Sequence, residues 1–359
     1  MLHKNKKGFR AGGYLIYIAQ DNVIRMKGMV LHKYAKVEDR PLKMEDLEPG
    51  DIKSDEILVK VIACGVCRTD LHIVEGQLGD ASLPLVPGHE IVGRVEEIGK
   101  DVWNLSEGDL VGVPWLHSTC GKCEFCLSGR ENLCHSKEFT GYTVNGGYAE
   151  YVKARSTFAF RLENGEDPYK AAPLLCAGII GYRAFKLAAP PPGGSIGMFG
   201  FGSSAHITLQ LASKLGFEAV AVSRSREHMD LAKRLGAAAA YSYDDLENIR
   251  GKLDSAIVFA PASRPILDAL ESVKSGGRVI VADIYVGNIE SFSYEKYLFN
   301  ERELKSVEAN TREDAVEFLA LSRRLKISSV VETVGLERAN EALERLKKGN
   351  VNGAMVLKL

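Results

Sequence analysis

Residues 195–223 read SIGMFGFGSSAHITLQLASKLGFEAVAVS, and this stretch decides the fold. A strand-like apolar run is followed by a glycine-rich turn, a segment with helical apolar spacing and a second strand-like run. Strand, helix and strand in this order predict a βαβ unit, in which the two strands lie parallel and the helix covers one face of the sheet.

The same alternation continues beyond this unit. Helical spacing recurs in REHMDLAKRLG (226–236) and SRPILDALESVKSGG (263–277), and strand-like runs recur in LDSAIVFAP (253–261) and RVIVADIYV (278–286). Repeated units of this kind predict the α/β fold class, with a doubly wound parallel sheet and helices on both of its faces.

The glycine-rich turn GFGSSA (200–205) fits the turn that binds a dinucleotide, because it lies between a strand and a helix. Gly200 permits the tight turn, Gly202 lets the backbone approach a pyrophosphate, and Ala205 stands in place of the motif's third glycine. The N-terminus of the helix that follows this turn attracts phosphates, and Ser203 within the turn is a further predicted cofactor-binding residue. We therefore expect a dinucleotide cofactor here.

The end of the second strand bears on which nicotinamide cofactor binds. NAD-binding sheets carry an acidic residue here that binds the ribose 2′-hydroxyl. This chain has Ser223 instead, so no carboxylate repels a 2′-phosphate, and Arg224 and Arg226 are close enough in sequence to bind one. The sequence slightly favours NADP(H) over NAD(H). In the alternative, both arginines face solvent and NAD(H) binds through its ribose diol.

Residues 56–155 have a different character from the βαβ region. EILVKVIACG (56–65) alternates apolar and polar residues, as a half-buried strand does. Further strand-like runs follow in HEIVGRVEEIG (89–99), GDLVGVPW (108–115) and GGYAEYVKA (146–154), separated by loops rich in glycine and proline. This pattern predicts an irregular antiparallel β domain.

The two ends of the chain differ in regularity. Residues 1–25 begin with several lysines and show no regular pattern, so we interpret them as an N-terminal extension or as the result of a start codon assigned upstream of Met26. A functional tail is the less favoured interpretation. At the other end, residues 312–324 and 337–348 have amphipathic helical spacing, and a strand-like run closes the chain.

Composition narrows the function classes. A chain of 359 residues has room for two domains, and its 46 basic and 47 acidic residues nearly cancel, which argues against nucleic-acid binding. No apolar run approaches the roughly 20 residues of a membrane-spanning helix. Seven cysteines, an odd number, do not suggest a secreted disulfide framework. We expect a soluble cytoplasmic protein with no nucleic-acid or membrane partner.

Four of the seven cysteines fall within residues 120–134, which read CGKCEFCLSGRENLC. Four thiolates on a short polar loop suit tetrahedral Zn²⁺ with no open position, which is a structural site. The loop has little apolar content, so a metal would supply the stability that a core cannot. The alternative is two disulfides or four free thiols. The predicted ligands are Cys120, Cys123, Cys126 and Cys134.

Three other residues suggest a second metal site. Cys67, His89 and Cys176 together would leave the fourth position of a zinc ion open, which is the arrangement of catalytic zinc. Their spacing alone is weak evidence, because a lone cysteine is more often a small core residue and a lone histidine is more often structural.

The sequence resembles the zinc-dependent alcohol dehydrogenases of the medium-chain dehydrogenase/reductase family. The resemblance rests on GVCRTDLH (65–72), PGHEIVGRVEEIG (87–99), the four-cysteine loop, LCAGIIGYRA (175–184) and the glycine-rich turn, and it extends from about Met26 to the C-terminus. It implies that Cys67, His89 and Cys176 bind the catalytic zinc.

The resemblance also implies roles for the neighbours of these ligands. Asp70 would orient His89 and fix its tautomer, and Glu90 would lie behind the zinc as part of the metal site. Thr69 would accept the proton of the substrate hydroxyl, His72 would pass it to solvent, and Arg68 would contact the cofactor pyrophosphate. In the alternative, Thr69 and His72 are only polar residues at the end of a strand.

The fold implied by the resemblance has two domains after the extension. Residues 26–176, completed by 311–359, would form a GroES-like catalytic domain, and residues 177–310 would form a Rossmann domain. The cleft between these two domains would bind the two reactants, the cofactor and the alcohol. The resemblance further implies two zinc ions per subunit and a homodimer or homotetramer.

The expected activity is interconversion of alcohols with aldehydes or ketones, in which zinc lowers the pKa of the alcohol and hydride moves to the nicotinamide. Trp115 would line a pocket for primary alcohols, aliphatic or aromatic. Cys176 argues mildly against a polyol dehydrogenase, and the intact ligand set argues against alkene reduction. The remaining alternatives are a non-catalytic zinc-binding structural protein and a zinc-organised nucleic-acid module.

Overall fold

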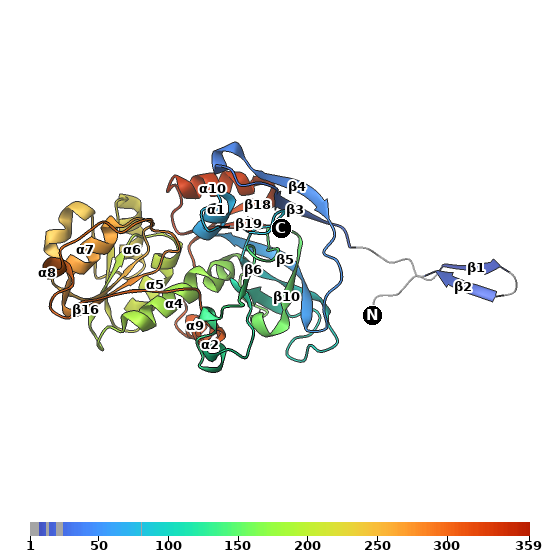
Figure 1. Cartoon of the computed structure of the whole chain (residues 1–359), viewed down its shortest axis with the longest axis horizontal. Helices are drawn as coiled ribbons and strands as arrows, with labels where there is room; N and C mark the ends of the chain where they lie inside the picture. Colours follow the sequence, from blue (N-terminus) through green and yellow to red (C-terminus); the bar gives the residue numbers. More distant parts are fainter. Residues whose placement is uncertain (1–6, 12–13, 19–23, 80) are drawn as a thin grey trace.

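The computed structural model describes residues 7–11, 14–18, 24–79 and 81–359. Figure 1 shows two bodies side by side, with a hairpin apart from both. One body is built on a parallel sheet and the other on a larger, mostly antiparallel sheet. The hairpin pairs β1 with β2, in register from Lys7↔Ile18 to Ala11↔Tyr14. It falls within the predicted N-terminal extension, whose other residues up to residue 23 lie outside the described part.

The first body contains a six-stranded parallel sheet in the order β14-β13-β12-β15-β16-β17. Phe199 at the end of β12 is level with Val222 of β13 and with Val258 of β15, so the loops that follow these three strands meet at one edge. The predicted α/β class with a parallel sheet is confirmed. The strands are β12 (Ser195–Phe199), β13 (Glu218–Val222), β14 (Ala239–Tyr241), β15 (Leu253–Val258), β16 (Val273–Val281) and β17 (Glu303–Ser306).

Helices cover both faces of this sheet, because its strands are apolar on both sides. Along β15, Ile257 belongs to the core formed with the helix residue Ile207, whereas its neighbour Val258 belongs to the core on the opposite face, with Ile266. The helices are α4 (Ala177–Ala188), α5 (Ser203–Lys214), α6 (Arg226–Arg234), α7 (Arg264–Ser272) and α8 (Tyr294–Tyr297).

The second body is organised by a seven-stranded sheet in the order β11-β7-β6-β5-β19-β18, with β10 also paired to β5. Strand β19, near the end of the chain, pairs antiparallel with β5, with Leu357 opposite Cys64. The C-terminal residues are therefore part of this sheet. The strands are β5 (Glu56–Val66), β6 (Glu90–Ile98), β7 (Leu110–Val113), β10 (Tyr151–Arg155), β11 (Phe160–Arg161), β18 (Val331–Gly335) and β19 (Ala354–Lys358).

Shorter elements complete the chain. The predicted helix over 312–324 is observed as α9, and the one over 337–348 starts as a 3₁₀ turn (Leu336–Arg338) and continues as α10. The paired strands are β1 (Lys7–Ala11) and β2 (Tyr14–Ile18), β3 (Met26–Leu31) and β4 (Leu42–Leu47), and β8 (Leu116–Ser118) and β9 (Glu138–Phe139); the helices are α1 (Arg68–Val74), α2 (Glu124–Leu127), α3 (Pro168–Ala171), α9 (Arg312–Arg324) and α10 (Ala339–Lys347).

Among the described residues, no single helix has the length and apolar composition to cross a membrane. One bent pair, Pro168–Leu175 with Ala177–Ala188, meets that test only when its two parts are taken together.

A buried histidine ties α5 to the other body. The Nε2 atom of His206 accepts a hydrogen bond from the backbone N–H of Val330 at 3.1 Å, and its Nδ1 lies 3.2 Å from the carbonyl oxygen of Gly202. Burial lowers the pKa of His206 to about 4. The ring is therefore neutral in the folded protein at pH values where it is protonated in the unfolded chain.

This histidine makes the fold sensitive to acid. Since the unfolded chain binds the extra proton below about pH 6.5, the free energy of unfolding falls as the pH drops from there toward 4. Between pH 7 and pH 5 we expect a loss of about 2 kcal/mol from this group. The replacement His206→Gln keeps an acceptor for Val330 and removes the titration. Urea unfolding of both proteins at the two pH values tests this; equal losses would contradict it.

Candidate functional site

The first candidate metal site lies where the two bodies meet. Cys67 is the residue before α1, His89 and Glu90 lie at the start of β6, and Cys176 immediately precedes α4. One ligand atom of each residue lies within 4.8 Å of the others. The topology thus brings together the four residues that the resemblance grouped, although they are far apart in the sequence.

The tautomer of His89 follows from its contacts. The side chain is completely buried, and its Nδ1 lies 2.9 Å from Oδ1 of Asp70, which, as a carboxylate, can only accept. Nδ1 therefore carries the hydrogen, and Nε2 has a free lone pair. Within the described part of the chain, that buried Nε2 has no hydrogen-bond partner. An orphaned imidazole nitrogen facing two thiols is the donor set that zinc requires.

Asp70 is itself held from several sides. Its Oδ2 accepts from the backbone N–H of Cys67 at 2.9 Å and from the hydroxyl of Tyr148 at 3.1 Å, and its Oδ1 also accepts from the N–H of Gly88. Sequence reasoning missed Tyr148, which is completely buried. Only its aromatic character within a strand-like run could have drawn attention to it. These contacts leave the carboxylate one orientation, which faces His89.

Glu90 occupies a space that Gly65 leaves open. A Cβ atom on Gly65 would lie 1.8 Å from Oε2 of Glu90, so no other residue fits opposite this carboxylate. The Oε1 atom accepts from the backbone N–H of Ala177 at 3.3 Å. Burial raises the pKa of Glu90 well above its ordinary value. Glu90 therefore lies behind the thiols in a place that suits a neutral carboxyl or one paired with a cation.

The pKa values of the two thiols of this site are shifted in opposite directions. The pKa of Cys67 is lowered well below its ordinary value because the Cys176 side chain hydrogen-bonds to it, and the pKa of Cys176 is raised by the same contact. A metal ion in this position would displace the thiol protons, because thiol ligands bind as thiolates. Cys64, which lies three residues before Cys67, is buried in β5, and burial raises the pKa of its thiol.

Thr69 and His72, the two residues predicted to move the substrate proton, have different surroundings. Thr69 lines the cleft, and its Oγ1 lies 3.6 Å from Sγ of Cys67. His72 is buried, with Nδ1 2.5 Å from Oε1 of Gln77, and no residue that the structure describes is a hydrogen-bond partner of its Nε2. The ring of Tyr285, 5.4 Å away, lies beside it. Gln77 and Tyr285 were not singled out from the sequence.

A cleft of about 1000 Å³ connects the metal site with the glycine-rich turn. Gly200 has a φ of +88°, and a Cβ there would lie 2.9 Å from the backbone nitrogen of Ala260, so the turn requires glycine. Arg226, the first residue of α6, is exposed and does not line the cleft. The predicted residues that line it are Cys67, Arg68, Thr69, Trp115, Cys176, Gly200, Gly202, Ser203, Ser223 and Arg224.

Aromatic side chains form the cleft wall near the metal site. The ring of Trp115 is stacked on Phe139, with centroids 4.6 Å apart, and meets the ring of His89 edge-on at 4.8 Å. Tyr142 is also stacked on Trp115, at 5.9 Å. Phe139 and Tyr142, which the sequence reasoning missed, make this wall flat and largely apolar.

The other end of the cleft gathers polar side chains. Ser223 and Arg224 are joined there by His228, by Tyr243 and by Lys348, which follows α10 in the second body. His228, Tyr243 and Lys348 were missed, because their proximity depends on how α6, the segment after β14 and the end of the chain pack together. Arg224 and Lys348 place two cations at this end of the cleft, and the residues that follow β13 place no carboxylate there.

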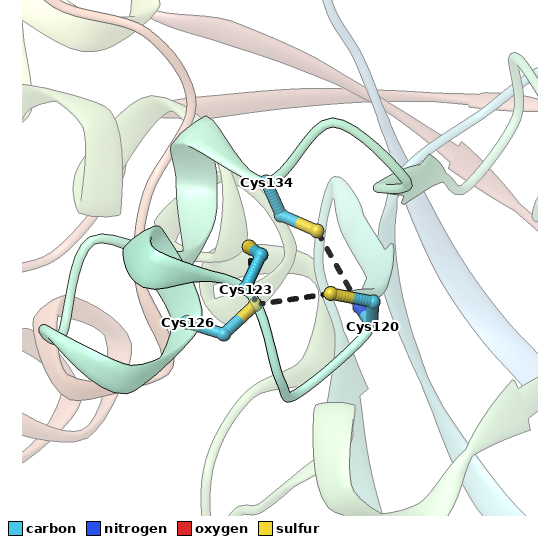
Figure 2. Close-up of side chains that lie close together, drawn as sticks. All are labelled: Cys120, Cys123, Cys126 and Cys134. Atoms are coloured by element: carbon cyan, nitrogen blue, oxygen red, sulfur yellow. Dashed lines mark hydrogen bonds between the residues drawn. The ribbon is translucent and has the colours of Figure 1, made fainter.

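The second candidate metal site is the four-cysteine loop (Figure 2). One sulfur of each residue lies within 4.8 Å of the others, and none of the four forms a disulfide. The distances are 3.5 Å between the sulfurs of Cys123 and Cys126 and 3.9 Å between those of Cys120 and Cys126. A tetrahedral zinc with Zn–S bonds of roughly 2.3 Å needs sulfurs about 3.8 Å apart. The loop fits zinc as it stands.

This loop is anchored to the rest of the chain by polar contacts. Glu131, which is buried, pairs with the guanidinium of Arg312 at 2.6 Å and accepts from its backbone N–H. Asn132 donates to the carbonyl oxygen of Glu308, a residue that lines the cleft. The loop therefore supports one side of the cleft.

Comparisons with known proteins agree with this geometry. Residues 53–164 match the family "Alcohol dehydrogenase GroES-like domain", and residues 205–324 match "Zinc-binding dehydrogenase". The chain is 43% identical to the "Probable alcohol dehydrogenase AdhA" of Mycobacterium tuberculosis, over 84% of this chain and 88% of that one. It is 40% identical to an alcohol dehydrogenase of Geobacillus stearothermophilus, over 93% and 99% of the two chains.

A solved structure is also similar. The cinnamyl alcohol dehydrogenase SbCAD4 of Sorghum bicolor superposes with a TM-score of 0.86 at 26% identity, over 93% of this chain and 98% of that one.

Proposed function

Since the chain belongs to the zinc-type alcohol dehydrogenases of the medium-chain dehydrogenase/reductase family, we propose that it interconverts primary alcohols, aliphatic or aromatic, with their aldehydes by hydride transfer to and from NAD(P)(H). A single observation carries the proposal. The orphaned Nε2 of His89 and the thiols of Cys67 and Cys176 lie at one cleft with the dinucleotide-type turn at Gly200.

Two zinc ions per chain are part of the proposal. Cys67, His89 and Cys176, with Glu90 behind them, would hold the first, and the four-cysteine loop would hold the second. When bound at the first site, zinc supplies Lewis acidity that polarises the substrate oxygen. The second ion would be structural, because its four thiolates leave no open position.

The chain's own residues would orient the reactants and move the proton. Asp70 holds the hydrogen of His89 at Nδ1, so that Nε2 faces the thiols. Thr69, whose hydroxyl lies beside Cys67, would take the proton of the substrate hydroxyl, and His72 would pass it toward solvent. The apolar wall of Trp115 would hold the carbon skeleton and exclude water.

The nicotinamide cofactor carries the hydride when bound, and we propose a modest preference for NADP(H). Arg224 lines the cleft next to Ser223, and neither residue repels a 2′-phosphate. Arg226 is exposed and outside the cleft, which leaves Arg224 as the predicted phosphate ligand from the segment after β13. Arg68, which donates to the carbonyl oxygen of Leu346, would contact the pyrophosphate. Assembly as a homodimer or homotetramer and a cytoplasmic location stay predictions.

Initial rates of benzaldehyde reduction, measured in parallel with NADPH and NADH on zinc-replete protein, test the proposal. We expect turnover with both cofactors and a faster rate with NADPH at subsaturating concentration. A preference for NADH would still support the alcohol dehydrogenase activity but would contradict the proposed role of Arg224 as a phosphate ligand. If neither cofactor is oxidised with benzaldehyde or with a panel of aliphatic aldehydes, the alcohol dehydrogenase activity is refuted.

A further inference from the structure

His228 connects the cofactor end of the cleft to the C-terminal part of the chain. It lies in the first turn of α6, with Nε2 3.1 Å from the carbonyl oxygen of Val351 and Nδ1 3.3 Å from Oγ of Ser223. Val351 lies just before β19, in the body that contains the metal site. The imidazole therefore bridges the two bodies, and it does so at Ser223, the residue from which the sequence predicted the choice of cofactor.

These contacts fix the direction of each hydrogen bond. A carbonyl oxygen can only accept, so in the neutral ring Nε2 carries the hydrogen and Nδ1 has the lone pair. Nδ1 then accepts the single hydrogen of the Ser223 hydroxyl. The same oxygen also accepts from the backbone N–H of Ser225 at 3.3 Å. What Ser223 has left to offer the cleft is a lone pair and no hydrogen.

A lone pair distinguishes the two forms of the cofactor. The ribose 2′-hydroxyl of NAD(H) can donate to it, whereas the 2′-phosphate of NADP(H) is an acceptor and gains nothing from it. Arg224 acts in the opposite sense, since its guanidinium attracts a phosphate whatever the state of Ser223. The two neighbouring side chains therefore favour different cofactors.

We propose that His228 is a positioning residue for cofactor choice: by holding the Ser223 hydrogen, it withholds a donor from the 2′-phosphate and so limits the preference for NADP(H). This inference rests on the proposed function, because it assumes that a nicotinamide cofactor binds at this end of the cleft. It adds that the preference between NADP(H) and NAD(H) is set by the direction of the hydrogen bond between Ser223 and His228 as well as by charge. Removing the acceptor at residue 228 would release the Ser223 hydrogen toward a 2′-phosphate.

A double-mutant cycle tests the proposal by binding alone. Dissociation constants for NADPH and NADH are measured by nucleotide fluorescence at pH 8, without substrate, for the wild type, His228→Leu, Ser223→Ala and the double variant. We expect His228→Leu to tighten NADPH binding about tenfold, the value of one hydrogen bond to a charged group, and to leave NADH within about twofold. In the Ser223→Ala background, His228→Leu changes the NADPH-to-NADH ratio by less than about twofold.

Ser223→Ala gives a second reading that does not depend on how the protein tolerates leucine at residue 228. It removes the lone pair, so NADH binding weakens about fivefold while NADPH binding stays within about twofold. Weaker NADPH binding in this variant would show that Ser223 donates to the phosphate and would overturn the proposal. Arg226→Ala, which changes an exposed residue outside the cleft, serves as the matched control and leaves both constants unchanged.

Two other outcomes separate the inference from the function on which it rests. If His228→Leu shifts the ratio equally with and without the Ser223 hydroxyl, the effect does not pass through Ser223 and the inference fails alone. If the wild type binds neither nucleotide, the proposed function fails and the inference fails with it.

Discussion

Replacing His89 by alanine abolishes turnover: we expect kcat for benzaldehyde reduction to fall by at least about 1000-fold, which corresponds to roughly 4 kcal/mol of lost transition-state stabilisation. The Nε2 of His89 has a buried lone pair with no hydrogen-bond partner among the described residues, and the thiols of Cys67 and Cys176 face it. Without the imidazole, only the two thiols and Glu90 remain as ligands at this site. Zinc content, measured by mass spectrometry of the metal, should fall from two ions to one per chain.

Cys64→Ala is the matched control for this experiment. Cys64 is a buried thiol three positions before Cys67, and it is not among the residues whose ligand atoms cluster. The control should keep two zinc ions and a kcat within a few-fold of the wild type. If His89→Ala retains both ions and most of its activity, the assignment of the first metal site is wrong.

Loss of the second site should act on stability. In Cys134→Ala, which removes a buried ligand, we expect one zinc ion per chain, a Tm lower by about 10 °C and rapid proteolysis within residues 120–134. The loop has almost no apolar side chains in the core, so a metal bound there would supply most of its stabilisation. Because Asn132 holds the carbonyl of Glu308 at the cleft, KM for the cofactor should also rise.

Leu127→Ala provides the control for that variant. Leu127 is in the same loop and is 77% exposed, so its truncation should change neither zinc content nor protease resistance. A Cys134→Ala protein that keeps two ions and an intact loop would contradict a structural role for the four cysteines.

Local patterns in the sequence were sufficient for the fold class. The βαβ order around Gly200 predicts a parallel sheet, and the spacing of the four cysteines predicts a cluster, because both signals lie within short stretches. The grouping of Cys67, His89 and Cys176 needed the family resemblance, since no local rule relates a residue before α1 to one before α4. Their functional roles are tested by the variants above.

What the sequence could not supply depends on contacts between distant segments. Tyr148 reaches Asp70 because β10 pairs with β5, and His228 reaches Val351 because the two bodies meet at the end of the chain. Neither contact leaves a local pattern. Arg226 shows the converse, since a cation close to Ser223 in sequence is carried away from the cleft by the first turn of a helix.

The most direct test of the account follows the hydride itself. Benzaldehyde is reduced by the zinc-replete protein with NADPH that carries deuterium at both C4 positions of the nicotinamide, and the product is examined by mass spectrometry. The account predicts benzyl alcohol with one deuterium on the carbinol carbon, and no product from the His89→Ala variant. Unlabelled benzyl alcohol, or equal yields from the two proteins, would contradict hydride transfer at this site.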